Sequence, residues 1–169
     1  LRFDWEMNGN WKFPWSEQLN ENQPGDFITA WRHVHDIFTE VGANNVSWVW
    51  CPNYSSPVTL AMESLYPGDT YVDWTCLDAY NKEDEWVSFQ TLMSGNNSWI
   101  FDSYTEITTV APSKPIMIGE TASVEAEDGG SKKAAWITDL FGTQLLRNYP
   151  NIKAIVWFNN NDGNPAYTF

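Results

Sequence analysis

The chain has 169 residues, of which 43% are hydrophobic, and its formal net charge is −13 at pH 7. This length suits a single globular domain, which we expect to span residues 1–169. The acidic balance disfavours nucleic acid and anionic membrane surfaces as partners, and the sequence contains no apolar run of about 18 residues that would span a bilayer. A neutral substrate fits this charge better.

Hydrophobic periodicity predicts a strand and then a helix at the start of the chain. Residues 1–8, LRFDWEMN, have the pattern of a strand, and residues 25–43 repeat apolar side chains at steps of three or four, as an amphipathic helix does. The apolar run at 46–53 predicts a second strand. A short helical piece near 59–65 then leads into the turn YPGD at 66–69.

Three further strands are predicted, with helices between them. The segments 71–81, 114–122 and 152–159 have the composition of strands, and helices are expected at about 98–110 and 132–149. The predicted order is therefore βαβαβαβαβ. Continuous apolar strands separated by helices are typical of an α/β protein with a parallel sheet covered on both faces.

Two parallel architectures fit this order, a (β/α)8 TIM barrel and an open doubly wound sheet. The nucleotide-binding form of the open sheet has a glycine-rich phosphate loop, and neither GxGxxG nor GxxxxGK[ST] follows a predicted strand. The predicted strands instead end in polar or aromatic residues, and barrel enzymes build their sites at that rim. A barrel uses roughly 31 residues per βα unit, so we expect a partial barrel that lacks about three units.

The two cysteines give no sign of a metal site. Cys51 and Cys76 form no CxxC motif and no cluster with histidine, so the sequence predicts neither a bound metal nor a cofactor. Two buried, unreactive thiols are the favoured interpretation. A disulfide between neighbouring strands is the alternative.

Two glutamates have positions that suit catalysis. Glu6 and Glu120 each lie at the C-terminal end of a predicted strand, so both would point into the mouth of one barrel. Paired carboxylates without metal ligands indicate glycoside hydrolysis, in which one carboxyl protonates the leaving oxygen and the other meets the anomeric carbon. The alternative is a solvated rim that is merely acidic.

Tryptophan is abundant, with eleven residues. Sugars expose C–H faces that stack on indole rings, and an aromatic face near an oxocarbenium-like transition state offers cation–π stabilisation. Most of the tryptophans are expected in the core. Trp11, in the loop after the first strand, and Trp157, at the end of the last, are predicted to face substrate, with Asn8 and Trp15 as further substrate-binding candidates.

Three segments together resemble glycoside hydrolase family 26: RFDWEMNGNWKFPW, YPGDTYVDWTCLDAYN and PIMIGETAS. This family contains β-mannanases and lichenases and belongs to a clan of retaining (β/α)8 enzymes. The resemblance covers nearly the whole chain, with the segments in the right order. It implies the C-terminal portion of a (β/α)8 TIM barrel, from about strand 4 to strand 8.

The resemblance also implies roles for individual residues. Glu6, in EMNG, matches the general acid/base, and Glu120, in GET, matches the nucleophile. Trp11 matches an aromatic residue beside the acid/base, and Tyr80 matches a tyrosine that hydrogen-bonds the nucleophile. Trp157 matches the aromatic platform under the sugar at the cleavage point.

Strand alternation predicts the neighbours of the two glutamates. Arg2, Asp4 and Glu6 share one face of the first predicted strand, so Arg2 and Asp4 are expected to form a charge-paired layer beneath Glu6. Tyr80 and Glu120 lie on adjacent strands, and the phenol is expected to donate to the carboxylate. Burial among indoles, together with the Glu120 charge, is expected to raise the pKa of Glu6.

These inferences predict a retaining endo-β-glycanase. The favoured substrate is β-1,4-mannan, with mixed-linkage β-glucan and then xylan as alternatives, because loops outside the motifs largely separate them. A carbohydrate-binding barrel without catalysis is a further alternative, which the two carboxylates and Tyr80 disfavour. Many family members have His where this chain has Trp5, a difference that bears on subsite preference more than on reaction type. The resemblance implies a plant-type β-linked polysaccharide as partner, a secreted, extracellular protein and a monomer.

Overall fold

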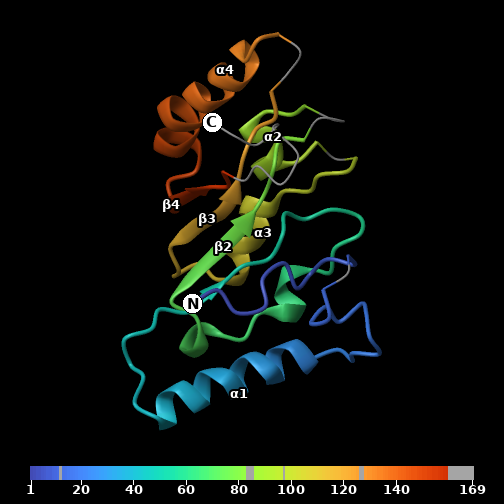
Figure 1. Ribbon diagram of the computed structural model, residues 1–169, viewed down its shortest axis with the longest axis vertical. Helices are drawn as coiled ribbons and strands as arrows, with labels where there is room; N and C mark the ends of the chain where they lie inside the picture. The colour runs from blue at the N-terminus through green and yellow to red at the C-terminus, as the bar shows by residue number, and fades with distance from the viewer. Residues whose placement is uncertain (12, 83–85, 97, 126–127, 160–169) are drawn as a thin grey trace.

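The computed structural model describes residues 1–11, 13–82, 86–96, 98–125 and 128–159. Its centre is a four-stranded parallel sheet in the order β1-β2-β3-β4 (Figure 1). The strands are β1 (Val49–Trp50), β2 (Trp74–Asp78), β3 (Ile116–Thr121) and β4 (Ile152–Trp157). The last four predicted strands are therefore confirmed as neighbours in one parallel sheet.

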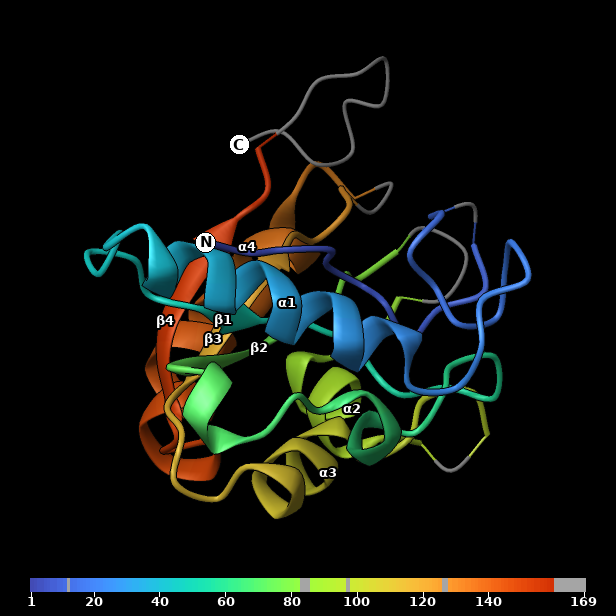
Figure 2. The same ribbon diagram turned by 90° about the horizontal axis from the view of Figure 1, so that it is seen from below.

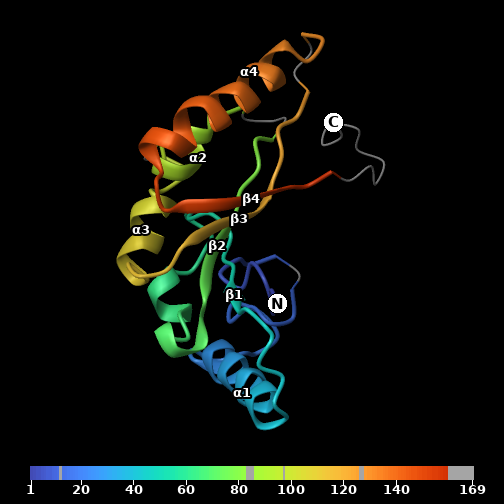
Figure 3. The same cartoon turned by 90° about the vertical axis from the view of Figure 1, so that its left-hand side faces the viewer.

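Helices connect the strands. The α-helices are α1 (Asp26–Glu40), α2 (Phe89–Ser94), α3 (Ser103–Val110) and α4 (Ser131–Asp139). The other helical segments are the 3-10 helices η1 (Met62–Leu65) and η2 (Asp69–Tyr71) and the π-helix η3 (Leu140–Asn148), which continues α4. Figure 3 shows α2, α3 and α4 on one face of the sheet, with the N-terminal segment on the other. Figures 1 and 3 place α1 at the β1 end of the molecule, far from α4, and Figure 2 shows the molecule from below, with α1 in front of the sheet.

The helix α2 is absent from the sequence prediction, which placed no helix between the strand at 71–81 and the helix at about 98–110. It has six residues and begins after Ser88, whose side-chain oxygen accepts a hydrogen bond from the Thr91 N–H at 3.1 Å. Such a cap stabilises the first turn of a helix that is too short to show apolar periodicity.

The first predicted strand, residues 1–8, is not a strand. Asp4 and Glu6 have φ values of 46° and 54°, which interrupt an extended backbone. The segment nevertheless lies along β1, where the Glu6 N–H donates to the Cys51 carbonyl at 2.7 Å. Glu6 is therefore presented by an irregular segment beside the sheet, not by the end of a strand.

The core fixes the sheet against its helices. Trp31 of α1, Trp50 of β1 and Phe89 of α2 are fully buried, as are Leu77 of β2 and Ile118 of β3. Full burial of a large apolar side chain contributes roughly 1.5–3 kcal/mol. The two central strands are thus held firmly, and the site described below lies at their carboxyl ends. Among the helices that the structure describes, none has both the length and the apolar composition that crossing a membrane needs.

A disulfide links Cys51, just after β1, to Cys76 in β2, with the two Cα atoms 4.2 Å apart. Both residues are fully buried. The favoured prediction of two free thiols is wrong, and the alternative of a bridge between neighbouring strands is confirmed. Because β1 has only two residues, this bond supplements a short backbone ladder.

Candidate active site

The carboxyl ends of β1, β2 and β3 bring three polar residues into one row. Asn53 forms a parallel bridge with Asp78, and Asp78 pairs with Glu120. A register shift after Leu77 places Asp78 opposite Glu120 instead of Gly119. The row lies at the edge of the sheet where barrel enzymes build their sites.

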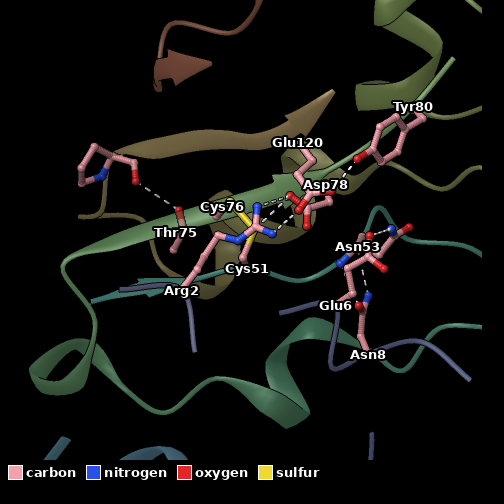
Figure 4. Close-up of a disulfide and its surroundings, with 11 residues drawn as sticks. Arg2, Glu6, Asn8, Cys51, Asn53, Thr75, Cys76, Asp78, Tyr80 and Glu120 are labelled. Atoms are coloured by element: carbon pink, nitrogen blue, oxygen red, sulfur yellow. Dashed lines mark hydrogen bonds and ion pairs between the residues drawn. A yellow bond between two sulfur atoms is a disulfide. The ribbon is translucent and has the colours of Figure 1, made fainter. Parts of the chain in front are cut away.

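Two donors hold the carboxylate of Glu120. The Tyr80 hydroxyl donates to its Oε2 at 2.5 Å, and the Arg2 guanidinium donates to its Oε1. Figure 4 shows the Tyr80 phenol directed at this carboxylate and Arg2 on its other side. The predicted hydrogen bond between Tyr80 and Glu120 is confirmed. Donors on both oxygens fix the orientation of the carboxylate.

Arg2 also pairs with Asp78, with 3.2 Å between Nη1 and Oδ1. The predicted layer of Arg2 and Asp4 is wrong, because the backbone turns at Asp4 and Arg2 reaches Asp78 and Glu120 instead. Burial raises the pKa of Asp78 to about 8 despite the opposing charge of Arg2, and the charges of Glu120 and Glu6 add to the rise. Arg2 therefore bridges the Asp78 and Glu120 carboxyl groups.

Gly119 provides the space for this arrangement. A Cβ atom there would overlap the Cys76 sulfur and lie 2.7 Å from Arg2 Nη1 and 2.8 Å from Asp78 Oδ1. Any side chain would therefore displace the pair of Arg2 and Asp78, and with it the donor to Glu120. The glycine of the GET motif therefore lets Arg2, Cys76 and Asp78 pack closely beneath Glu120, the residue that follows it.

Glu6 has different neighbours. Its Oε1 accepts a hydrogen bond from Asn53 Nδ2 at 2.7 Å. Asn53 is in turn held by Asn8, whose Oδ1 accepts from the Asn53 N–H at 2.8 Å and whose Nδ2 donates to the Asn53 carbonyl at 2.9 Å. Figure 4 shows the three residues together. Asn8 is fully buried, so it positions Asn53, which the sequence patterns did not identify as a partner of Glu6.

Burial raises the pKa of Glu6, as predicted. The hydrogen bond from Asn53 stabilises the carboxylate and lowers this pKa, whereas the nearby charge of Glu120 raises it. The net direction is upward. A carboxyl with a raised pKa stays protonated over a wider pH range, which is the property that a general acid needs.

Glu6 lines a cavity of about 560 Å³, a volume within the usual range of small-ligand sites. Of the predicted residues, Trp11 and Tyr80 line it as well. Gly9 lies against the Trp11 ring, and a Cβ atom there would overlap the ring atoms. The glycine of the EMNG motif therefore lets the indole fold back to the side of the cavity.

Two of the predicted aromatic residues have other contacts. Trp15 stacks on Phe13 with ring centroids 4.8 Å apart, and its indole N–H donates to the Trp5 carbonyl at 2.8 Å. It lines a separate shallow hollow near the start of α1. Trp157 packs edge-to-face against Trp136 of α4, with 6.2 Å between ring centroids. Neither contact involves a bound sugar, so the predicted places of Trp15 and Trp157 beneath a sugar stay predictions.

Phe158 lines the cavity at the end of β4. Successive residues of a strand face opposite sides, so Phe158 faces the cavity where Trp157 faces the helix. Its ring meets Tyr80 edge-to-face at 5.7 Å, and its N–H donates to the Thr121 carbonyl at 2.8 Å. The sequence patterns missed Phe158 because they do not give the register of β4.

Among the described residues, one set of three potential metal-ligating side chains lies close together, Cys51, Cys76 and Asp78. The two sulfurs are joined in the disulfide, so they do not offer thiolates. This cluster serves as part of the floor beneath the carboxylates.

The carboxyl edge of this parallel sheet carries two carboxyl groups and several aromatic rings, and the pKa of one of the carboxyl groups, Glu6, is raised. These features define a site of the glycoside hydrolase type. The family model for Glycosyl hydrolase family 26 matches residues 1–136. The chain belongs to this family.

Three known proteins illustrate the similarity. Endoglucanase H of Acetivibrio thermocellus is 36% identical over 169 residues, covering 92% of this chain and 17% of that protein. Mannan endo-1,4-beta-mannosidase A and B of Caldalkalibacillus mannanilyticus is 39% identical over 84 residues, covering 46% of this chain and 15% of that protein. The catalytic domain of the GH26 endo-beta-1,4-mannanase of Bacillus sp. JAMB-750 matches in structure with a TM-score of 0.70 at 22% identity, over 99% of this chain and 42% of that one.

The chain thus spans less than a fifth of the two curated relatives and under half of the solved domain. The structural match concerns the fold. The predicted fold class is confirmed: the sheet and its helices are the C-terminal portion of a (β/α)8 barrel.

Proposed function

We propose that the chain carries the catalytic centre of a retaining endo-β-glycanase that cleaves β-1,4-mannosidic bonds. The observation that supports this function is the contrast between its two carboxylates. Tyr80 and Arg2 hold Glu120 with both oxygens bonded, whereas burial raises the pKa of Glu6 beside the cavity. One group is prepared to attack as an anion, and the other to donate a proton.

In the proposed reaction Glu120 attacks the anomeric carbon while Glu6 gives its proton to the glycosidic oxygen. The bond to the leaving chain breaks, and a covalent glycosyl ester forms on Glu120. Glu6, now a carboxylate, then takes a proton from water as the water oxygen attacks the same carbon. Glu120 departs, and the configuration at the anomeric carbon is retained.

Two polysaccharides compete as the substrate. The name of the Caldalkalibacillus relative favours mannan, and the name of the Acetivibrio relative, which matches over more of this chain, favours a glucan. Mannan remains our proposal, and mixed-linkage β-glucan is the second candidate. The bond-breaking step is the same for both substrates, so the residues that serve it do not discriminate between them. These residues are Glu6, Asn53, Tyr80 and Glu120.

Hydrolysis assays on the full-length protein test this proposal. We expect the highest kcat/KM on soluble β-mannan, a lower value on lichenan and the lowest on xylan, with oligosaccharides of mixed length as early products. Proton NMR of the first products should show the β-anomer before mutarotation. A protein lacking both Glu6 and Glu120 is the control. A higher kcat/KM on lichenan would make the enzyme a glucanase, α-anomer products would exclude retention, and binding without hydrolysis would exclude catalysis.

Asn53→Ala is expected to move the alkaline limb of the kcat/KM profile to higher pH. The Asn53 hydrogen bond lowers the pKa of Glu6, so its loss should raise that pKa and keep the acid form present at higher pH. The measurement is kcat/KM against pH on a soluble oligosaccharide. Asn44→Ala, at an exposed position after α1, should leave the limb in place. An unmoved or lowered limb in Asn53→Ala would contradict this role.

We also propose that the protein acts outside the cell. The Cys51–Cys76 disulfide supports this location, because disulfides persist mainly in oxidising compartments. A polymeric substrate also supports an extracellular location, because a long glycan outside the cell must be cut before it can enter.

A further inference from the structure

The cavity beside Glu6 continues into a second hollow of about 280 Å³. Both are lined by the same five residues, namely Tyr54, Ser56, Val58, Tyr80 and Lys82. They are therefore two parts of one groove. Its far part is completed by Val87, Leu92, Trp99 and Ile100, from the loops on either side of α2 and from α2 itself.

Trp99 is unusual for so large an aromatic side chain, because it is 58% exposed. Its backbone is nevertheless held firmly. The side-chain Oδ1 of Asn96 accepts hydrogen bonds from the N–H groups of Ser98, Trp99 and Ile100 at 3.0, 3.1 and 3.2 Å. The Asn96 N–H donates to the Ile100 carbonyl at 2.9 Å. The indole is thus presented to solvent by a turn that one asparagine closes.

The same turn is tied to the opposite wall of the groove. The Phe101 N–H donates to the Ser55 carbonyl at 2.8 Å, and Ser55 lies between two residues that line the groove, Tyr54 and Ser56. The Ser55 N–H in turn donates to the Ser103 hydroxyl oxygen at 2.8 Å. An exposed aromatic ring on a backbone fixed in this way loses little freedom when a ligand covers it.

The chemistry of the far hollow suits a sugar ring. Trp99 and Val87 offer apolar surface to the C–H face of a pyranose, while the Ser56 hydroxyl and the Lys82 ammonium lie where ring hydroxyls can bind. Continuity with the cavity beside Glu6 favours a further unit of the same glycan chain over an unrelated ligand.

We propose that the far hollow, which we call the Trp99 site, binds a sugar unit on the leaving-group side of the cleaved bond. The inference rests on the proposed function and extends it. The sugar that becomes attached to Glu120 must lie against β3, whereas the groove leads away from β3 over the loops that follow β1 and β2. Glu6, which protonates the leaving oxygen, lies beside β1 on the same side.

The test compares Trp99→Ala with wild type in the full-length protein on two substrates. One is the polysaccharide that the wild type cleaves fastest, and the other is a 2,4-dinitrophenyl β-bioside of the same sugar, which has no sugar in its leaving group. We expect kcat/KM on the polysaccharide to fall about tenfold, the effect of losing one aromatic contact. The value on the aryl bioside should stay unchanged, and Trp99→Phe should recover part of the loss.

Trp86→Ala is the matched control, because Trp86 is also exposed, at 41%, and belongs to the loop before α2. It should retain activity on both substrates. Equal losses on both substrates in Trp99→Ala, or no loss on the polysaccharide, would overturn the assignment. A loss confined to the aryl bioside would overturn it too, because it would place the site on the other side of the bond.

Wild-type turnover reports on the proposed function separately. If the wild type cleaves neither substrate, mobility in native gels that contain soluble β-mannan still tests the site. Trp99→Ala should then be retarded less than the wild type and less than Trp86→Ala. Equal retardation of all three proteins would overturn the Trp99 site.

Discussion

Replacing Glu120 with Ala in the full-length protein is expected to reduce hydrolysis of every substrate to near background, a loss of several orders of magnitude. The variant lacks the nucleophile, so even a substrate with a good leaving group cannot form the covalent intermediate. Azide fits the space left by the carboxylate and should restore turnover. Because azide attacks from the side that Glu120 occupied, the glycosyl azide should have inverted configuration, which NMR of the product measures.

Two variants control this experiment. Glu40→Ala changes an exposed glutamate at the end of α1 and should keep full activity. Glu120→Gln keeps the volume of the side chain, so it should be inactive and should resist rescue by azide. Circular dichroism should confirm that both Glu120 variants remain folded, since Arg2 loses one of its two carboxylate partners in each. A product of retained configuration from Glu120→Ala with azide would assign the nucleophile to another residue.

Replacing Glu6 with Ala is expected to cause a loss that depends on the leaving group. A polysaccharide has a poor alkoxide leaving group that needs a proton, so its hydrolysis should fall by orders of magnitude. A dinitrophenyl glycoside leaves without a proton, so Glu120 should still form the covalent intermediate. Stopped-flow absorbance should then show a burst of dinitrophenol followed by slow turnover, because the base for the second step is also missing.

Azide separates this variant from the first. In Glu6→Ala the azide attacks the intermediate on Glu120, so the product should have retained configuration. Asn53→Ala, which keeps Glu6 itself, should not show the burst. If Glu6→Ala lost activity equally on the polysaccharide and on the activated glycoside, the assignment of Glu6 as the proton donor would be wrong, even in a protein that cleaves mannan.

The sequence predicted those parts of the site that depend on local periodicity. Apolar runs marked β2 and β3, and alternation within them placed Tyr80 and Glu120 where they could meet. The pKa of Glu6 was predicted in direction because the surrounding indoles imply burial. These features need only the two-residue repeat of a strand and the adjacency of consecutive parallel strands.

The remaining features depend on register and backbone conformation, which the sequence does not show. The partners of Arg2 follow from the turn at Asp4 and from the shift that brings Asp78 opposite Glu120. The disulfide follows from the register of β1 against β2. The place of Phe158 beside the cavity follows from the shifted pairing of β3 with β4. In each case a difference of one residue changes which side chain faces the site.

At Glu6 the left-handed backbone lowers the stability of the fold, while the side chain is needed for the proposed activity. A residue other than glycine at such a φ is strained, by about 1–2 kcal/mol on average. Glycine would relieve that strain and would also remove the proton donor of the proposed reaction. Selection for a more stable chain would therefore drive this position toward glycine, and selection for turnover would retain the glutamate. Screens for thermostable variants should accordingly discard activity here unless they select for both properties.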